Sequence, residues 1–455
     1  MERERLGSRL GFILLSAGCA IGLGNVWMFP YRAGQNGGAV FVLFYLLFLV
    51  IMGIPVMTME FALGRASQKS PARLYHALEP KGSKWHIHSY AALAGNYLLM
   101  MFYTSVTGWL LKYGVGTAAG DFEGLDKKGI ETYFASIKAD PLLMVILVAI
   151  VVCLGFFVCS FSLQKGIERI TKYMMSALLV IMVVLAINSC FLPGGAEGLK
   201  FYLVPDFNKV QEAGLLNVIV AAMNQSFFTL SLGIGSMAIF GSYIGKERAL
   251  MGESVRVAVL DTFVAITSGL IIFPACFSYD VDVNAGPDLI FITLPHVFNN
   301  LPFGRVWGTL FFVFLIFAAF STVLAIFENL ISCTKDLFGW SRKKASLINC
   351  AIMFVLALPC ALGTNLLSFI KPFGAGSNIM DFEDFLVSNL LLPIGSLTFI
   401  MFCSHKFGWG WKNFIKEANT GKGLKFPEKI RPYIAYVLPV VVFALFVLGL
   451  YSFFA

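Results

Sequence analysis

The sequence predicts an all-α polytopic membrane protein with about eleven transmembrane helices. Of its 455 residues, 58% are hydrophobic and only 13% are charged, whereas soluble globular domains carry about 25% charged residues. One spanning helix needs about 20 mostly apolar residues, so this chain accommodates roughly eleven helices with their connections. The apolar runs, such as 40–56 and 142–157, are continuous, whereas the strands of an outer-membrane barrel alternate polar and apolar residues. The composition therefore excludes a water-soluble protein and disfavours a barrel.

Apolar runs bounded by charged residues and by Gly and Pro clusters place the individual spans. They begin near Leu10, Ala39, Ser89, Pro141, Gly166, Gly214, Gly252, Gly304, Ala345, Asp381 and Arg431. This order predicts four regions along the chain: a first half of five spans (1–190), an extracellular connection (191–213), a second half of five spans (214–404), and a cytoplasmic loop with the last span (405–455). Residues 285–300, between spans seven and eight, form a segment too short and Pro-broken to cross the membrane. We expect an external helical hairpin or lid there.

The distribution of positive charge orients the chain, because Lys and Arg collect in cytoplasmic loops. With the N-terminus inside, most of the 34 Lys and Arg residues fall on the inner side. An odd number of spans then places the C-terminus outside the cell. The net charge of +8 therefore reflects topology, and we expect the lipid bilayer rather than a nucleic acid as partner. The nine Cys residues lie almost all within apolar runs without ligand spacing, which is typical of core residues.

Glycine clusters interrupt two of the spans near their middle. Span one contains Gly18, Gly22, Gly24 and Pro30, and span six contains Gly233 and Gly235. Each helical glycine costs about 1 kcal/mol relative to alanine, so such clusters unwind a helix locally. Close helix packing through small residues is the alternative explanation. The two interruptions fall at corresponding places in two sets of five spans, which is typical of inverted-repeat transporters with a midplane substrate site.

Asp261 is a carboxylate well inside span seven. A charged residue at that depth costs roughly 2.5 to 3.5 kcal/mol on insertion scales, so it predicts an ion or proton site. The alternative is a structural carboxylate capped by a neighbouring hydroxyl such as that of Thr262. Glu60 and Glu328 lie near the inner ends of their spans, and we expect interfacial or packing roles for them. Oxygen donors that suit the hard cation Na+ surround the interruptions, namely Asn25, Thr229, Ser231, Ser321 and Thr322.

Several motifs, read together, identify a family resemblance. They are Arg9–Leu14 (RLGFIL), Gly22–Trp27 (GLGNVW), Phe29–Tyr31 (FPY), Asn36–Gly38 (NGG), Gly53–Pro55 (GIP), Phe227–Gly233 (FFTLSLG) and Ile292–Pro295 (ITLP). The chain resembles the neurotransmitter:sodium symporter family, specifically its bacterial LeuT-type amino-acid transporters, over essentially its whole length. The resemblance implies a LeuT-type fold with a five-plus-five inverted repeat, helices 1 and 6 unwound at the midplane, and a place in the bacterial inner (cytoplasmic) membrane.

The resemblance also implies two Na+ sites. The first falls on Ala20, Asn25, Thr229 and Asp261, completed by the carboxylate of the substrate. The second falls on Gly18, Ile21, Ala318, Ser321 and Thr322. Chloride-dependent members carry Asn at the position of Asp261 and Ser one turn later, where this chain has Ala265. A fixed negative charge beside Na+ can replace a bound anion, so we expect no chloride requirement.

The substrate site carried over from the family is a set of residues around the two interruptions. It comprises Ala20, Gly22, Leu23, Gly24, Leu99, Tyr103, Phe228, Thr229, Ser231, Ile234, Val323 and Ile326. Backbone amides near Leu23 and the hydroxyl of Tyr103 would hold the carboxylate, and carbonyls near Ser231 the ammonium group. Amine-transporting members carry Asp where this chain has Gly22, so an amino acid is favoured. The apolar side-chain pocket favours a hydrophobic or aromatic one.

The gates expected from the resemblance are partly altered. The outer gate of the family pairs an Arg with an Asp, but this chain has Met28 with Asp381. We therefore expect an apolar lid that closes on Phe228 and Tyr103. The inner gate is expected to be Arg3 with Asp336, supported by Tyr243.

Together these features predict a sodium-coupled, chloride-independent symporter that takes up a hydrophobic or aromatic L-amino acid by alternating access. A proton-coupled amino-acid transporter that uses Asp261 is the alternative. A channel or a membrane enzyme is disfavoured, because no repeated pore lining is evident and all five His residues lie in loops or at span ends. These are His76, His86, His88, His296 and His405. The oligomeric state has no signature in the sequence.

Overall fold

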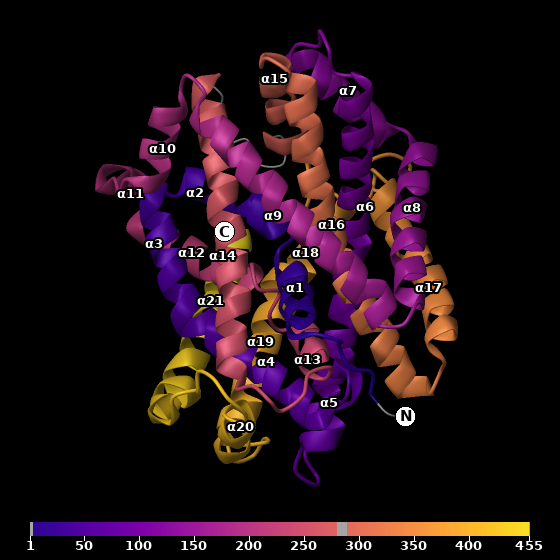
Figure 1. Ribbon diagram of the computed structural model, residues 1–455, viewed down its shortest axis with the longest axis vertical. Helices are drawn as coiled ribbons and strands as arrows, with labels where there is room; N and C mark the ends of the chain where they lie inside the picture. The colour runs from indigo at the N-terminus through magenta and orange to yellow at the C-terminus, as the bar shows by residue number, and fades with distance from the viewer. Residues whose placement is uncertain (1–2, 280–288, 455) are drawn as a thin grey trace.

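The computed structural model describes residues 3–279 and 289–454, which are helical with no β-strand (Figure 1). The first half contains α1 (Arg9–Ala20), α2 (Phe29–Gln35), α3 (Ala39–Phe48), α4 (Ile54–Ser67), α5 (Pro71–Leu78), α6 (His88–Ala119), α7 (Lys127–Ala139), α8 (Pro141–Ser160) and α9 (Arg169–Cys190). The predicted external connection folds into α10 (Gly195–Leu203) and α11 (Phe207–Ala213). The remainder contains α12 (Leu215–Phe228), α13 (Ser236–Gly241), α14 (Leu250–Ser278), α15 (Leu294–Asn299), α16 (Gly304–Phe338), α17 (Arg342–Leu362), α18 (Ile379–Phe385), α19 (Leu392–Ser404), α20 (Trp411–Ala418) and α21 (Leu438–Phe454).

Wide π-helical turns lead into several of these helices. They are Gly24–Met28, Leu49–Gly53, Gln164–Glu168, Leu289–Thr293, Leu386–Leu391 and Tyr433–Val437. Narrower 3-10 turns cover Trp85–Ile87 and Glu428–Ile430. A π turn inserts a residue into the helical ladder, and two of these turns join helices directly: Leu49–Gly53 joins α3 to α4, and Leu386–Leu391 joins α18 to α19.

The described residues contain eight helical segments long and apolar enough to cross a membrane, and a ninth if α1 and Gly24–Gln35 count as one span bent by 58°. The predicted third span is α6, a continuous helix of 32 residues. The predicted sixth span is α12 and α13, separated by a break. Each predicted span therefore has a helical counterpart that begins within a few residues of the expected position.

Helix α16 forms the centre of the bundle. Every residue from Ala318 to Thr334 is buried, and the helix packs against α6, α9, α1 and α8. The peripheral helices instead expose apolar side chains along one face. On α8 this face is formed by Leu142, Ile146, Ile150, Leu154 and Phe157. Their spacing of three to four residues defines one stripe, which in a membrane protein faces lipid.

The described part of the expected external lid is a single helix rather than a hairpin. Residues 289–299 form one π turn followed by α15, and residues 285–288 lie outside the described part of the chain. The segment is buried from Leu289 to Pro295 and packs against α16 and α7. The segment is therefore a packed part of the bundle, because α16 and α7 bury its apolar side chains.

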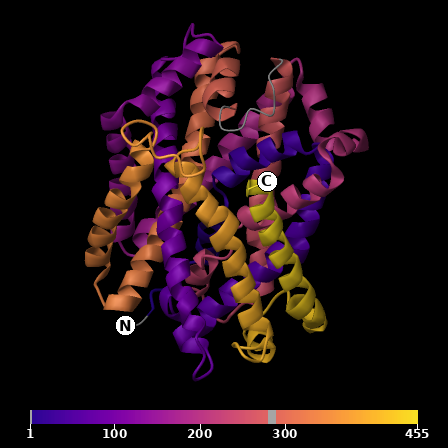
Figure 2. The ribbon, with the colours of Figure 1, turned by 180° about the vertical axis from the view of Figure 1, so that it is seen from behind.

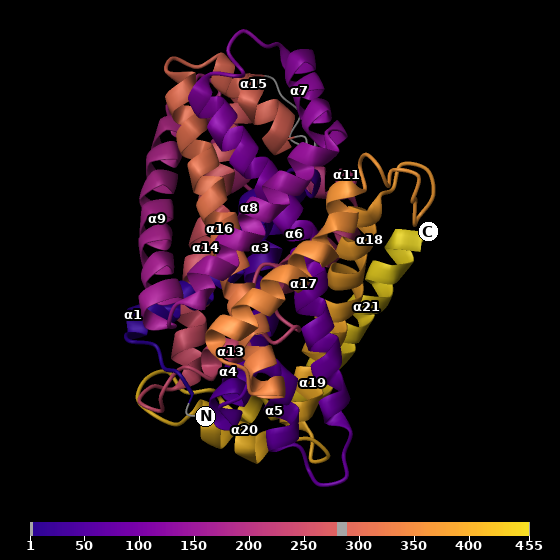
Figure 3. The ribbon, with the colours of Figure 1, turned by 90° about the vertical axis from the view of Figure 1, so that its right-hand side faces the viewer.

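The two ends of the bundle carry the segments that the predicted topology assigns to opposite sides. The N-terminus, α5 and α20 lie at one end, and α7 and α15 lie at the other (Figures 1 and 3). Helix α21 lies at the edge of the bundle against α19 (Figure 2). We call the end with α5 the inner end and the end with α7 the outer end.

Candidate functional site

The break in span one lies at the buried centre of the molecule and leaves the last carbonyls of α1 without partners in their own helix. Helix α1 ends at Ala20, and the next helical turn begins at Gly24. A β-carbon on Gly22 would lie 2.6 Å from the hydroxyl oxygen of Tyr103 and 2.8 Å from that of Thr322, so only glycine fits there. The last carbonyls of a helix have no intrahelical partner and carry partial negative charge. The C-terminus of α1 therefore favours a cation.

The break in span six covers the residues between Phe228 and Ser236. Gly233 has φ +105°, and a β-carbon there would lie 2.2 Å from the carbonyl oxygen of Leu392. The freed N–H of Gly233 donates to Oε1 of Glu60 at 2.7 Å, and that of Met237 donates to Oε2 at 3.3 Å. Glu60 is fully buried, which excludes the interfacial one of the two roles expected for it, interfacial or packing. It caps the second half of span six.

A buried polar cluster joins spans one, six and seven. The side-chain amide of Asn25 donates to Oδ1 of Asp261 at 2.7 Å and to Oγ1 of Thr229 at 2.9 Å. The Thr229 hydroxyl in turn donates to Oδ2 of Asp261 at 2.9 Å, and the Tyr45 hydroxyl lies 3.4 Å from the same oxygen. The hydroxyls bonded to Asp261 thus come from Thr229 and Tyr45 rather than from Thr262. All these partners of the carboxylate are neutral, and a buried carboxylate is costly without a counter-charge.

The residues of the expected second Na+ site also lie together. The carbonyl oxygen of Gly18 accepts hydrogen bonds from Ser321 at 3.0 Å and Thr322 at 3.2 Å. The Thr322 hydroxyl lies 3.3 Å from the carbonyl oxygen of Ile21, and that of Ser321 lies 2.9 Å from the carbonyl of Ala318. Five buried oxygens of α1 and α16 therefore share one small volume. Carbonyl and hydroxyl oxygens are the ligands that a hard cation prefers.

A cavity of about 260 Å³ lies between the two breaks. Eight of the expected substrate residues line it, namely Ala20, Gly22, Leu23, Gly24, Leu99, Tyr103, Phe228 and Ser231. The N–H of Leu23 donates to the Tyr103 hydroxyl at 3.1 Å. Further lining comes from Cys19, Trp27, Met28, Tyr31, Phe102, Val106, Thr322, Met380, Asp381, Asp384 and Leu392. The cavity therefore extends from the break in span one to the first turn of α2 and to α18.

Four expected substrate residues do not line this cavity. They are Thr229, Ile234, Val323 and Ile326. Thr229 belongs to the Asp261 cluster. The side chain of Ile234 packs against Gly95 of α6, and that of Val323 faces Gly155 of α8. The apolar part of the cavity lining includes Leu99, Phe102, Val106, Met380 and Leu392.

Arg32, which the sequence did not assign to the site, lies beside Phe228 of the cavity wall. Arg32 stands one helical turn after Met28, and its guanidinium donates to Gln225 at 2.9 Å and lies 5.9 Å from the ring centre of Phe228. Gln225 donates to the carbonyl of Gly24 at 3.0 Å. Asp384, which lines the cavity, lies within electrostatic range of Arg32. The four-residue spacing from Met28 is the signal that identifies Arg32, because it places both on one face of α2.

Asp381 and Met28 both line the outer part of the cavity. Asp381 is committed to the N-terminus of α18, where its carboxylate accepts from the Asn378 N–H at 2.8 Å while its own N–H donates to the Asn378 side chain at 3.3 Å. This reciprocal capping stabilises the start of α18.

The inner end of the bundle is closed by ion pairs. Arg3 pairs with Asp336 at 3.1 Å, donates to Ser242 at 3.0 Å, and lies 5.0 Å from the ring centre of Tyr243. The Tyr243 hydroxyl donates to Glu328 at 2.6 Å. The three residues expected at the inner gate are therefore together.

A second set of ion pairs holds the N-terminal segment against α16 and α17, next to this gate. Glu4 pairs with Lys335 at 2.7 Å and with Arg342 at 3.3 Å, and Arg342 also pairs with Glu328. Burial opposes ionisation of Glu4, but Lys335 and Arg342 outweigh it and lower the pKa of Glu4 to about 2. Glu328 is buried within this network.

Comparison with known proteins agrees with this geometry. The sequence profile of the Sodium:neurotransmitter symporter family matches residues 3–120 and 132–455. The uncharacterized sodium-dependent transporter YhdH of Bacillus subtilis (strain 168) is 33% identical over 450 residues, which cover 98% of both chains. The sodium-dependent serotonin transporter of Drosophila melanogaster is 26% identical over 432 residues, which cover 83% of this chain and 68% of that protein.

A solved structure matches over nearly the whole chain. The crystal structure of MhsT in complex with L-phenylalanine superimposes with a TM-score of 0.87 at 34% identity, and covers 98% of this chain and 99% of MhsT. MhsT has the LeuT fold. The predicted fold class is therefore confirmed.

Proposed function

The chain belongs to the sodium:neurotransmitter symporter family, and from this premise we propose that it takes up a hydrophobic or aromatic L-amino acid together with Na+. That it is a multi-pass membrane protein and a sodium-coupled transporter follows from the family and from its transporter relatives. The proposal adds the substrate class, two Na+ sites, independence from chloride, and the direction of transport into a bacterial cell.

The observation that carries the proposal is that both polar clusters adjoin one apolar cavity. Thr322 lines it, and Asn25 accepts at 3.2 Å from the N–H of Gly22, which also lines it. An amino-acid carboxylate placed beside the Leu23 N–H and the Tyr103 hydroxyl would sit at the start of the second half of span one. The ammonium group would then face the carbonyls at the end of α12, where Phe228 and Ser231 line the cavity. Helix termini of opposite partial charge orient such a zwitterion. The apolar lining by Leu99, Phe102 and Val106 favours a hydrophobic side chain.

We propose that Na+ couples to transport because each cluster joins elements that move relative to one another. The Gly18 and Thr322 cluster joins α1 to α16, and the Asp261 cluster joins spans one and six to α14. A ligand shifts a conformational equilibrium only through different affinities for the two states. An ion that needs ligands from both elements satisfies that condition. Loss of the ion from the α1 and α16 cluster would release α1 and open the inner end.

The gates follow from the charged groups at the two ends of the cavity. On the inner side, release of Arg3 from Asp336 and of the stacked Tyr243 would open the path. On the outer side, Met28 and Asp381 form no ion pair with each other. We propose that Arg32, held by Gln225 over Phe228, supplies the positive charge of the outer gate and approaches Asp384 when the cavity closes.

A proton-coupled transporter remains the second candidate, and one observation favours it. All partners of Asp261 are neutral, and a proton neutralises a buried carboxylate as well as Na+ does. The two candidates differ in their response to sodium at constant pH.

The proposal is tested by the thermal stability of the purified protein in the presence of each of the twenty amino acids, in NaCl and in choline chloride. Ligands that bind the native state raise its apparent stability. We expect the largest increase from aromatic and large aliphatic L-amino acids, and only in NaCl. Replacement of chloride by gluconate should leave the increase intact. Stabilisation by small polar amino acids alone, or equal stabilisation in choline, would contradict the proposal.

A further inference from the structure

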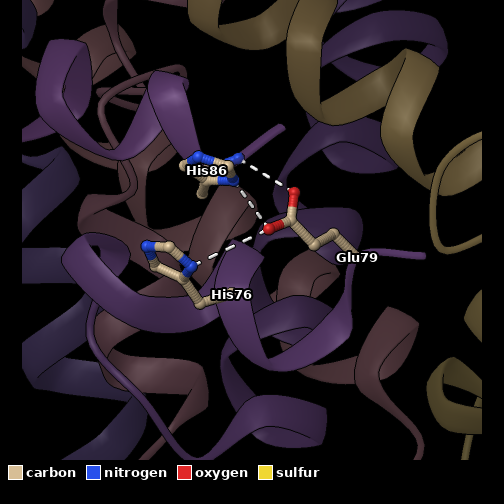
Figure 4. A group of neighbouring side chains, drawn as sticks. All are labelled: His76, Glu79 and His86. Atoms are coloured by element: carbon tan, nitrogen blue, oxygen red, sulfur yellow. Dashed lines mark hydrogen bonds and ion pairs between the residues drawn. The ribbon is translucent and has the colours of Figure 1, made fainter. Parts of the chain in front are cut away.

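Two histidines and a glutamate converge at the inner end of the bundle, outside the transport site (Figure 4). His76 lies in the last turn of α5, Glu79 follows that helix directly, and His86 lies in the turn that leads into α6. Nδ1 of His86 lies 2.7 Å from Oε1 of Glu79, and Nδ1 of His76 lies 3.8 Å from the same oxygen. The nitrogen and oxygen ligand atoms of all three residues lie within 4.8 Å of one another.

These separations suit a small metal ion. Zinc bonds of about 2.0 to 2.1 Å in tetrahedral geometry place two ligand atoms about 3.3 Å apart. The two distances to Glu79 lie on either side of that value. The imidazole rings are stacked, with centres 4.5 Å apart and planes 14° apart, so one ring must turn before both nitrogens address one ion. The side chain of His76 is 38% exposed and has room to turn.

The surroundings supply the orientation that a metal ligand needs, because hydrogen bonds to one oxygen of Glu79 fix its carboxylate. The Ser83 hydroxyl donates to Oε2 of Glu79 at 2.9 Å, and the backbone N–H of His86 donates to the same oxygen at 3.2 Å. These bonds leave Oε1 directed at the histidines. The side chains of Lys81 and Lys84 in the same loop are exposed, so their ammonium groups lie in solvent.

We infer that His76, Glu79 and His86 bind a divalent transition-metal ion of the zinc type at the inner end of the transporter. Imidazole and carboxylate ligands suit Zn2+, Co2+ or Ni2+, whereas Mg2+ and Ca2+ select sites made of oxygen alone, and Cu+ selects sulfur. Three protein ligands leave the fourth position of a tetrahedral ion to water.

Helix α5 connects the metal site to the inner gate, so metal binding should affect gating. This effect on gating rests on the proposed function. Helix α5 begins at Pro71, directly after Ser70, whose N–H donates to Oδ2 of Asp336 at 2.6 Å. The same carboxylate pairs with Arg3. A metal ion would fasten the other end of α5 to the start of α6. It would thereby stabilise the arrangement in which Arg3 and Asp336 are paired, and slow the opening of the inner end.

Binding is tested by titrating Zn2+ into the purified full-length protein by calorimetry at pH 7.5, with an affinity tag that contains no histidine. We expect saturable binding of one ion. His76→Gln and His86→Gln should each lower the affinity by at least about tenfold, since even the loss of an outer-shell partner costs 10- to 100-fold. His405→Gln removes a histidine outside the cluster and serves as the matched control. Its affinity should equal that of the wild type.

Equal affinity in all four proteins, or no saturable binding to the wild type, would overturn the inference. The thermal unfolding of each variant without metal is measured first, and Glu79→Gln, which keeps an acceptor for Ser83, provides a third variant if a histidine variant is unstable. The gating consequence is tested separately by the uptake rate in proteoliposomes with Zn2+ added to both sides. Zn2+ should slow the wild type and the His405→Gln variant, but not His76→Gln. Because calorimetry needs no transport, a failure of the proposed function does not affect the binding result.

Discussion

Asp261 is the residue on which the coupling account depends. Its carboxylate is buried, and Asn25, Thr229 and Tyr45 contact it without supplying a positive charge. A neutral residue one turn later, Ala265, leaves the negative charge of this cluster to Asp261 alone. The charge and its deep position were evident from the sequence. The partners were found through the family resemblance and the structure, because residues far apart in the chain supply them.

Replacement of Asp261 by Asn should weaken Na+ coupling and make transport depend on chloride. The amide keeps the shape and the oxygen of the carboxylate but loses its charge, so an added anion can restore the missing charge. The measurement is Na+-dependent amino-acid uptake in chloride and in gluconate. We expect at least about a tenfold higher Na+ requirement in gluconate, equivalent to roughly 1.4 kcal/mol. The adjacent Thr262→Ala is the control and should behave as wild type. Full chloride-free uptake by the Asn variant would contradict the role of this charge.

At the scale of elements, the interruptions of spans one and six were predictable because glycine clusters are local features. The rotation of each helix about its own axis, which decides the side chains that face the cavity, was not predictable. Helix α16 is apolar on nearly all sides, and a helix that is hydrophobic all round has no amphipathic stripe to orient it. This explains why Val323 faces α8 instead of the cavity. The partners of Glu60 were not predictable for a related reason, because they are backbone N–H groups, which leave no trace in the sequence.

Removal of the Glu60 carboxylate should destabilise the broken part of span six. Without it, the Gly233 and Met237 N–H groups are left buried and unpaired, which costs about 1 to 3 kcal/mol for each. Glu60→Ala should therefore lower the melting temperature of the purified protein and reduce uptake. Glu60→Gln retains an acceptor and should lie between this variant and the wild type. The exposed acid Glu197 of α10 provides a control through Glu197→Ala. A melting temperature unchanged by Glu60→Ala would show that span six does not depend on this cap.

At the scale of the whole molecule, the fold places a cavity between two ends that are closed by different means. The inner end is closed by ion pairs from the N-terminal segment to α16 and α17, and at the outer end we propose closure by aromatic side chains with Arg32. The number and order of the helical spans were predictable from apolar runs. The docking of residues 3–8 against the bundle was not predictable, because it depends on tertiary ion pairs and this segment has no apolar pattern of its own.

The docking of the N-terminal segment should depend on pH only in the acid range. Lys335 and Arg342 lower the pKa of Glu4 from its ordinary value of 4.5 to about 2. A lowered pKa in the folded state stabilises the docked segment fully above about pH 4.5, and this stabilisation is lost as the pH falls towards 2. Amide hydrogen exchange of residues 3–8, corrected for the intrinsic effect of pH, should therefore show constant protection from pH 7 to 5 and a decrease below. In Glu4→Gln the protection should be lower at pH 7 and its decrease in acid smaller, because Glu168 still accepts from the Gly7 N–H at 2.7 Å. A decrease already between pH 7 and 6 would assign the docking to another group.

The central claim is that Na+ drives amino-acid uptake through the two polar clusters beside the cavity. The most direct measurement is uptake of labelled L-phenylalanine into proteoliposomes at constant pH, with an inward gradient of Na+ or with choline in its place. The account predicts accumulation above equilibrium in Na+, and uptake no faster than in protein-free liposomes with choline. Accumulation that survives the replacement by choline and follows an imposed proton gradient would contradict it.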